Sequence, residues 1–292
     1  MKPTARWIPY FLVAPAFAIF SLAILGPILA TFGLSLTNWD GFSTPSFVGL
    51  DNFARAFQDK IYMDSYWHAG VYIAATLVLE VVVGLLLAGL VSAKRNTTFY
   101  RVAFFTPVML PLVVISVLWS FILNPDLGIL NRFLGDIGLE SWQKIWLGEQ
   151  ATALLSLSVI SGWIFAGFYM AIFYAGFQRI PTTIIESARL DGATEWQLLR
   201  QIKIPMVKNL TEVAVLLCFT GGIQVFDLVY VLTNGGPYDT TQVPTTYLVR
   251  VVFRDQQMGY GSALAVILTM VVVLVGLIYT KVRTKEDAVV EY

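Results

Sequence analysis

Long apolar stretches alternate with short polar ones along most of the chain. An α-helix needs about 20 apolar residues to cross the hydrocarbon core of a bilayer, and six stretches reach that length. The first follows Lys2 and Arg6, but it is longer than the apolar part of a signal peptide and lacks a convincing cleavage site, so we expect it to be retained. The predicted membrane-spanning helices are residues 10–36, 69–91, 102–123, 151–175, 210–232 and 262–280.

Composition agrees with a membrane environment. The 292 residues are 57% hydrophobic and only 13% charged, and the mean hydropathy is +0.71. Because roughly 25% of the residues of a soluble domain are charged, the expected solvent is membrane lipid. The formal net charge is zero, which gives no reason to expect a nucleic-acid partner. We therefore predict an all-α membrane protein with six transmembrane helices.

The distribution of Lys and Arg predicts how the chain is oriented. Cytoplasmic loops carry an excess of these residues, and most of the 19 in the chain fall on the cytoplasmic side if the N-terminus lies there. We therefore expect both termini in the cytoplasm. The same reasoning divides the chain into an N-terminal helix with its outer loop (1–68), a transmembrane domain (69–281) and a cytoplasmic tail (282–292).

Residues that could carry out chemistry are scarce. The single cysteine, Cys218, and the single histidine, His68, exclude an internal disulfide, a multi-cysteine metal site and the usual Ser/His or Cys/His catalytic pairs. We expect neither a metal nor a cofactor in this chain. It has no phosphate-binding loop of the GxxxxGK[ST] type, so any ATP must be bound by another chain. A membrane-embedded enzyme is therefore the least favoured function.

Three carboxylates lie within the predicted spans. Glu80 is in the middle of the second span, and Glu212 and Asp227 are in the inner and outer parts of the fifth. An ionisable group at membrane depth indicates a function by default, although Glu212 is close enough to the interface to be hydrated. No Lys or Arg lies at the depth of Glu80 or Asp227, so both carboxylates face a watery cavity or pair with another subunit.

A polar segment, "IPTTIIESARLDGATEWQLLRQIKIP", separates the fourth and fifth spans on the predicted cytoplasmic side. Pro181 suits the first turn of a helix, which we expect over 182–190. Gly192 then breaks the helix, because glycine adopts backbone conformations that other residues avoid. The segment thus begins with a short helix and a bend.

A second short helix is expected over 194–201. Thr194 is a typical N-cap, and Pro205 is expected to end the element. The apolar side chains of the two helices are too many to leave in water, so they must pack against the protein's own helices or against a second protein. These are Ile184, Ile185, Leu190, Trp196, Leu198, Leu199 and Ile202.

The order of residues in "ESARLDGATEWQLLRQIKIP" resembles the EAA loop of ABC-importer permeases. That motif reads Glu, Ala, Ala, two residues, Asp-Gly-Ala, and an apolar run ending in Ile-x-Leu-Pro. The departures here are Ser187 for Ala, Leu199 for a frequent Phe and Ile204 for Leu, all small or volume-conserving. In that family the loop is a coupling helix that fits a cleft on the ATPase subunit. The resemblance implies this role for Glu186, Ser187, Ala188, Asp191, Gly192, Ala193, Ile202 and Pro205.

Other stretches are similar to the sugar-permease branch of the family, the maltose- and glycerol-phosphate-type importers, and within it to the first of two paired subunits. They are "FVGLDNFARAF", "FYRVAFFTPVMLPLVVISVLWSFILNPDLGILN", "FDLVYVLTNGGPYDTTQVPTTYLVRVVF" and "MGYGSALAVIL". The resemblance implies import of a sugar or oligosaccharide across a bacterial or archaeal plasma membrane. It also implies three kinds of partner: a second homologous permease, an ATPase dimer that binds ATP and Mg, and an extracytoplasmic solute-binding protein.

The resemblance also assigns residues to two further sites. The turn that receives the binding protein corresponds to Asn234, Gly235, Gly236 and Pro237. The family's sugar contacts correspond to Ser161, Ile164, Phe165, Phe168, Cys218, Gly221, Gly222 and Val225, to which we add the polar Gln224 and Asp227. Paired glycines suit a helix interior poorly, so they bend the fifth span or leave room for a cavity. The family's polar contacts in that span are absent here, which leaves open whether the pocket lies mainly in this subunit or in its partner.

Two other functions stay open. One is an ABC permease for a phosphorylated polyol or another small solute. An anionic solute favours Arg or Lys along the pathway, and none lies at membrane depth. The other is an ATP-independent secondary transporter, which would show an internal repeat, broken helices and more paired intramembrane charges. The sequence shows no convincing repeat, and a coupling loop would then have no purpose.

Overall fold

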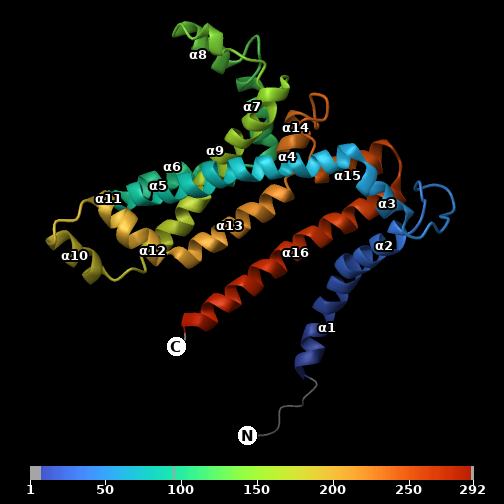
Figure 1. Cartoon of the computed structure of the whole chain (residues 1–292), viewed down its shortest axis with the longest axis horizontal. Coiled ribbons are helices and arrows are strands. Elements are labelled where there is room, and N and C mark those ends of the chain that lie inside the picture. Colours follow the sequence, from blue (N-terminus) through green and yellow to red (C-terminus); the bar gives the residue numbers. More distant parts are fainter. Residues whose placement is uncertain (1–7, 95, 291–292) are drawn as a thin grey trace. The chain divides into compact units, whose positions relative to one another are not determined.

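The computed structural model describes residues 8–94 and 96–290 (Figure 1). Within these ranges the regular structure is helical, apart from an isolated β-bridge between Thr37 and Phe47. Five described helices are long and apolar enough to cross a membrane: Tyr10–Ser35, Lys60–Ser92, Gln150–Phe177, Lys208–Leu232 and Met258–Lys281. A sixth span forms if one bent helix pair is counted as a unit. The predicted all-α membrane fold is confirmed.

The bent pair corrects the prediction of one helix over 102–123. Helix α6 (Thr97–Phe105) and the 3₁₀ turn η3 (Thr106–Met109) precede α7 (Leu112–Ile122), and the chain bends by 95° between the two halves. Pro111 explains the break, because it has no N–H and because its ring disfavours helical geometry in the residue before it. Leu110 accordingly has the extended angles φ −83° and ψ 144°.

The chain divides into two compact units. The smaller comprises Met1–Lys60 and Leu248–Leu274, and the larger comprises Ile61–Tyr247 and Val275–Tyr292. These boundaries come from packing alone, and the predicted division at 68/69 and 281/282 stays a prediction. Helix α16 (Met258–Val290) extends into the predicted tail 282–292, of which residues 291 and 292 lie outside the described residues.

The smaller unit ties the first span to the start of the last. It contains α1 (Ile8–Phe20), η1 (Ser21–Leu25), α2 (Gly26–Ser35), α3 (Asp51–Gln58) and the first part of α16. The buried Asn52 donates hydrogen bonds to the carbonyl oxygens of Ser35 and Thr37, at 2.9 and 2.8 Å. The Tyr260 hydroxyl donates to Asp59 at 2.7 Å, and the Arg55 guanidinium lies 4.0 Å from the centre of the Tyr260 ring.

The larger unit is built around two long helices. One is continuous through α4 (Lys60–Thr76), the π-helical turn η2 (Leu77–Val82) and α5 (Val83–Ser92); the other is α9 (Gln150–Phe177). Glycines let them approach closely, as small residues do between membrane helices. A Cβ added at Gly84 would lie 2.7 Å from Cβ of Tyr169, and one added at Gly162 would lie 2.6 Å from Cβ of Leu79.

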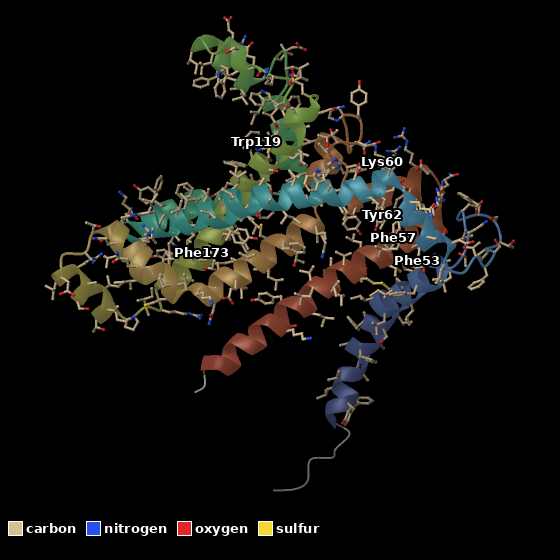
Figure 2. All side chains as sticks on the ribbon, in the orientation of Figure 1. Phe53, Phe57, Lys60, Tyr62, Trp119 and Phe173 are labelled. Atoms are coloured by element: carbon tan, nitrogen blue, oxygen red, sulfur yellow. The ribbon has the colours of Figure 1, made fainter. Side chains whose placement is uncertain are left out.

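Further helices complete this unit (Figure 1). They are α8 (Ile129–Asp136), η4 (Glu140–Trp142), α13 (Lys208–Ile223), α14 (Asp227–Leu232) and, beginning in it, α15 (Pro244–Val249), which η6 (Arg250–Arg254) follows. Phe173 on α9 is fully buried in a core shared with α5 and α13 (Figure 2). Trp119 on α7 packs edge to face against Trp163 on α9, with ring centres 5.7 Å apart.

The polar segment between the fourth and fifth spans forms α10 (Thr182–Leu190), α11 (Glu195–Gln197), the π-helical turn η5 (Leu198–Lys203) and α12 (Ile204–Met206). The predicted helix over 182–190 is confirmed, and so is the N-cap at Thr194, which forms a reciprocal capping box with Gln197.

The prediction that Pro205 ends the second helix was wrong, because this helix continues to Met206. Proline is tolerated here where the hydrogen-bond pattern returns from π-helical to α-helical spacing. The Ile204 N–H bonds the Leu199 carbonyl and the Val207 N–H bonds the Lys203 carbonyl. The missing N–H of Pro205 therefore leaves the bonds on either side of it intact.

Candidate functional site

A cavity of about 360 Å³ lies in the larger unit, where the fifth span is broken. Helix α13 ends at Ile223 and α14 begins at Asp227, so three residues interrupt the span one residue after Gly222. Gly221 and Gly222 both line the cavity, which is one of the two outcomes expected for them, and they lie just before the break in the helix. The other walls come from α4, η2 and α9, and from the break between α6 and α7.

Nine of the ten residues predicted for the solute pathway line this single cavity. They are Ser161, Phe165, Phe168, Cys218, Gly221, Gly222, Gln224, Val225 and Asp227. Ile164 does not, because its side chain is fully buried in a core cluster with Ile115 and Leu228. That a solute passes through the cavity stays a prediction.

A small polar cluster forms one wall. Glu80 is buried, and its Oε1 accepts a hydrogen bond of 2.7 Å from the Ser161 hydroxyl. The thiol of Cys218 lies 3.8 Å from Glu80 Oε2 and 3.6 Å from the hydroxyl oxygen of Thr76, within reach of either acceptor. Side chains from η2, α9, α13 and α4 thus converge on one point of the cavity.

Sequence reasoning missed Tyr72 and Thr76, which also line the cavity. It had singled out Glu80 as an intramembrane carboxylate without assigning it to the pathway. The three residues are spaced four apart, and residues at this spacing lie on one face of a helix. That spacing, next to a carboxylate at membrane depth, was the signal that could have found them.

Aromatic side chains form part of the remaining wall. Phe165 and Phe168 come from α9, and Phe226 comes from the break in the fifth span. The Phe226 ring stacks on the Tyr230 ring with centres 4.9 Å apart. Apolar faces beside a few hydrogen-bonding groups suit a solute that has both C–H surfaces and hydroxyl groups.

The polar segment is anchored to the larger unit through η5. The Leu198 and Leu199 side chains are buried, and a Cβ added at Gly89 on α5 would lie 2.6 Å from Leu199 Cδ2. The ammonium of Lys203 donates a hydrogen bond of 2.9 Å to the Ser92 hydroxyl at the end of α5. Desolvation lowers the pKa of Lys203 below its ordinary value. The second short helix is therefore fixed to α5.

The first short helix and the bend are exposed. Gly192 at the bend has φ +85°, in the left-handed region, and Arg189 pairs with Glu195 across the bend at 2.7 Å. Leu190 and Trp196 are 89% and 59% exposed. Some apolar residues of the polar segment therefore pack on the protein's own helices, and others remain exposed to a partner. Of the predicted coupling residues, six are on α10 or the bend: Glu186, Ser187, Ala188, Asp191, Gly192 and Ala193.

The predicted docking turn has an unusual backbone. Asn234 and Gly235 have φ of 49° and 85°, and the Gly236–Pro237 peptide is cis. Gly235 packs against the buried Gln242, whose carbonyl oxygen lies 3.0 Å from His68 Nδ1 on α4. The α10–α11 segment lies at the α5 end of the long helix, whereas α14, which leads into this turn, lies beside the α4 half (Figure 1).

Comparison with known proteins identifies the family. Residues 80–284 match the sequence model of the family described as "binding-protein-dependent transport system inner membrane component". The chain belongs to this family. The matched range begins at the cavity carboxylate and includes the whole polar segment between the fourth and fifth spans.

Relatives match over nearly the full length. The probable ABC transporter permease protein YurN of Bacillus subtilis is 35% identical, over 94% of this chain and 95% of its own. The diacetylchitobiose uptake system permease protein NgcF of Streptomyces coelicolor is 31% identical, over 87% of this chain and 76% of its own. A solved bacterial ABC transporter involved in the import of the acidic polysaccharide alginate shares the fold, with a TM-score of 0.84 and 21% identity over 96% of both chains.

The chain is thus a multi-pass permease subunit of a binding-protein-dependent ABC importer, as its resemblance to the EAA loop predicted. Broken helices are also typical of secondary transporters, but the family match assigns the broken third and fifth spans to an ABC permease. In this protein they shape the cavity of an ABC permease.

Proposed function

We propose that this subunit imports a sugar or oligosaccharide, driven by ATP hydrolysis in a separate ATPase. The observation that carries the proposal is the cavity, which is lined both by the aromatic rings of Phe165, Phe168 and Phe226 and by the polar cluster of Glu80 and Ser161. The flat C–H faces of a sugar suit such rings, and its hydroxyl groups suit the acceptors. The name of the relative NgcF, a permease for diacetylchitobiose uptake, supports the same class of solute.

Coupling to the ATPase is proposed to run through one continuous helix. The hydrogen bond between Lys203 and Ser92 and the contact between Leu199 and Gly89 attach η5 to the end of α5. Helix α5 continues without a break into η2, which carries Glu80. A displacement of the exposed α10–α11 segment by the ATPase is therefore passed along α5 to the cavity wall. ATP binding and hydrolysis would shift the population between inward-facing and outward-facing arrangements.

The proposal requires partners that complete the importer. Two ATPase subunits would bind ATP and Mg and receive the exposed residues of α10 and the bend. A second homologous permease would close the pathway from the other side. An extracytoplasmic binding protein would dock at the turn that contains Asn234 and Pro237. Both termini would then lie in the cytoplasm of a bacterial or archaeal cell, with the helices in its plasma membrane.

Purification of the chain from its native membrane in mild detergent, followed by mass spectrometry, tests the assembly. We expect an ATPase, a second six-helix permease and a binding protein to be recovered with it. Proteoliposomes that contain this complex should then accumulate a labelled neutral oligosaccharide only when ATP is inside and the binding protein outside. Recovery of this chain with copies of itself alone, or uptake that does not depend on ATP, would contradict the proposal.

A further inference from the structure

The charges around the cavity are of one sign. Glu80 and Asp227 are its two carboxylates, and the described residues that line it include no Lys, Arg or His. Glu80 is 6% exposed and forms no ion pair with any described residue. A buried charge without a protein counter-ion requires hydrogen-bond donors or water around it. The Ser161 hydroxyl and the Cys218 thiol are two such donors, and water or a solute in the cavity can supply others.

Glu80 has acceptor capacity that the described residues leave unused. A carboxylate offers about four acceptor sites on its two oxygens. The Ser161 hydroxyl occupies one of them on Oε1, and the Cys218 thiol, a weak donor, is 3.8 Å from Oε2. The remaining sites can accept hydrogen bonds from hydroxyl or amino groups of a solute in the cavity.

The position of Glu80 is fixed by the packing around it. It lies in the π-helical turn η2, and single π-turns inside α-helices are frequent at functional sites. Gly162, the residue after Ser161, lets α9 approach η2 so closely that a Cβ there would lie 2.6 Å from Leu79 Cβ. The hydrogen bond from Ser161 to Glu80 therefore joins two helices that are held at short range. The carboxylate is set in place before a solute enters.

We propose that Glu80 determines the charge selectivity of the solute pathway. It accepts hydrogen bonds from the hydroxyl or ammonium groups of neutral and amino-bearing sugars, and it repels solutes that carry a carboxylate or phosphate group. This inference rests on the proposed function, because it takes the cavity to be the pathway. It decides against a phosphorylated polyol as the solute of this subunit.

Charge selectivity can be measured with a thiol placed in the cavity. Gly221 lines the cavity, and a Cβ added there has no atom within 4 Å, so Gly221→Cys fits without displacing a neighbour. Cys218→Ala removes the single native thiol of the chain. In the purified complex, this chain is then labelled with methanethiosulfonates that carry a trimethylammonium, a sulfonate or a neutral ethyl group, and mass spectrometry gives the three rates.

The cationic reagent should label faster than the anionic one, after each rate is corrected for the rate of the same reagent with a free thiol. Adding Glu80→Gln should reduce this ratio about fivefold or more, because it removes a charge from the same cavity and a single charge at about 4 Å is worth about 1 kcal/mol even in water. If the substitution changes the reactivity of the thiol itself, both labelling rates change alike and their ratio does not. Glu80→Asp should retain the ratio, and Glu212→Gln, which removes a carboxylate paired with Lys208 outside the cavity, should not change it.

Two results would overturn the proposal. One is a corrected cationic-to-anionic labelling ratio of one or below in the protein that still has Glu80. This result is obtained without any substitution at position 80. The other is a ratio that Glu80→Gln leaves unchanged or that Glu212→Gln reduces equally. Because labelling requires neither ATP nor an identified sugar, a failure here leaves the import assay unaffected. A failure of ATP-driven uptake likewise leaves the labelling ratios valid.

Discussion

Substitutions at Gly192 test how the bend of the polar segment works. The residue has φ +85°, and its N–H donates a hydrogen bond of 3.0 Å to the Arg189 carbonyl. A Cβ added there has no atom within 4 Å, so a substitution acts through the backbone alone. Alanine in this conformation costs about 1–2 kcal/mol, whereas asparagine tolerates it better. Proline cannot adopt a positive φ, and it also removes the N–H.

The contacts that hold the bend contribute about as much free energy as alanine at position 192 would cost. The capping box at Thr194 contributes about 1 kcal/mol. The ion pair of Arg189 with Glu195 has both side chains half exposed, so it adds no more than about 1 kcal/mol. Gly192→Ala should therefore reduce the ratio of bent to unbent loop by about 5–30-fold. Gly192→Asn should reduce it less, and Gly192→Pro should abolish the native bend.

The assay is binding-protein-stimulated ATPase activity of the complex in proteoliposomes, beside the amount of each variant in the membrane. Activity should fall in the order Gly, Asn, Ala, Pro, while the amounts stay similar because the bend is exposed. The reasoning is refuted if Gly192→Pro retains stimulated ATPase activity. It is also refuted if Gly192→Asn loses as much activity as Gly192→Pro.

Four further substitutions have clear expected results. Lys203→Met keeps the packing of the side chain but removes the hydrogen bond to Ser92; it should lower uptake while ATPase activity persists, and equal losses of both would argue against a role in coupling. Gly162→Ala places a methyl group against η2 and should destabilise the purified chain by about 1–3 kcal/mol in thermal unfolding. Ile164→Ala should cost about 2–5 kcal/mol of stability with the KM for the solute unchanged, whereas Phe165→Ala should raise that KM.

Much of the fold could be predicted because the lipid environment imposes simple rules. Apolar length located the spans, and Pro181, Gly192 and Thr194 each have a local backbone reason for their places in the α10–α11 segment. The break at Pro111 was less predictable, since proline in a membrane helix is often tolerated. The continuation of the helix past Pro205 depends on a π-helical turn, which no residue type in the sequence specifies.

The site was harder to predict than the fold. Helix α9 is apolar all round, so periodicity does not show which of its faces lines the cavity. Ile164 and Phe165 are neighbours in sequence, yet one is buried in the core and the other lines the cavity. Packing against α4, α7 and α14 decides between them. The carboxylate of Glu80 was visible in the sequence, but its pairing with Ser161, 81 residues away, required the structure.

We propose that the exposed part of the α10–α11 segment binds an ATPase. Leu190 on this segment is 89% exposed, and Leu127 in the loop after α7 is a matched control at 86%. A photoreactive amino acid at each position, followed by illumination of the intact complex and mass spectrometry, tests the claim most directly. We predict that the ATPase is cross-linked from position 190 and not from position 127. Cross-linking of the ATPase from position 127, or from neither position in a complex that transports, would contradict the account.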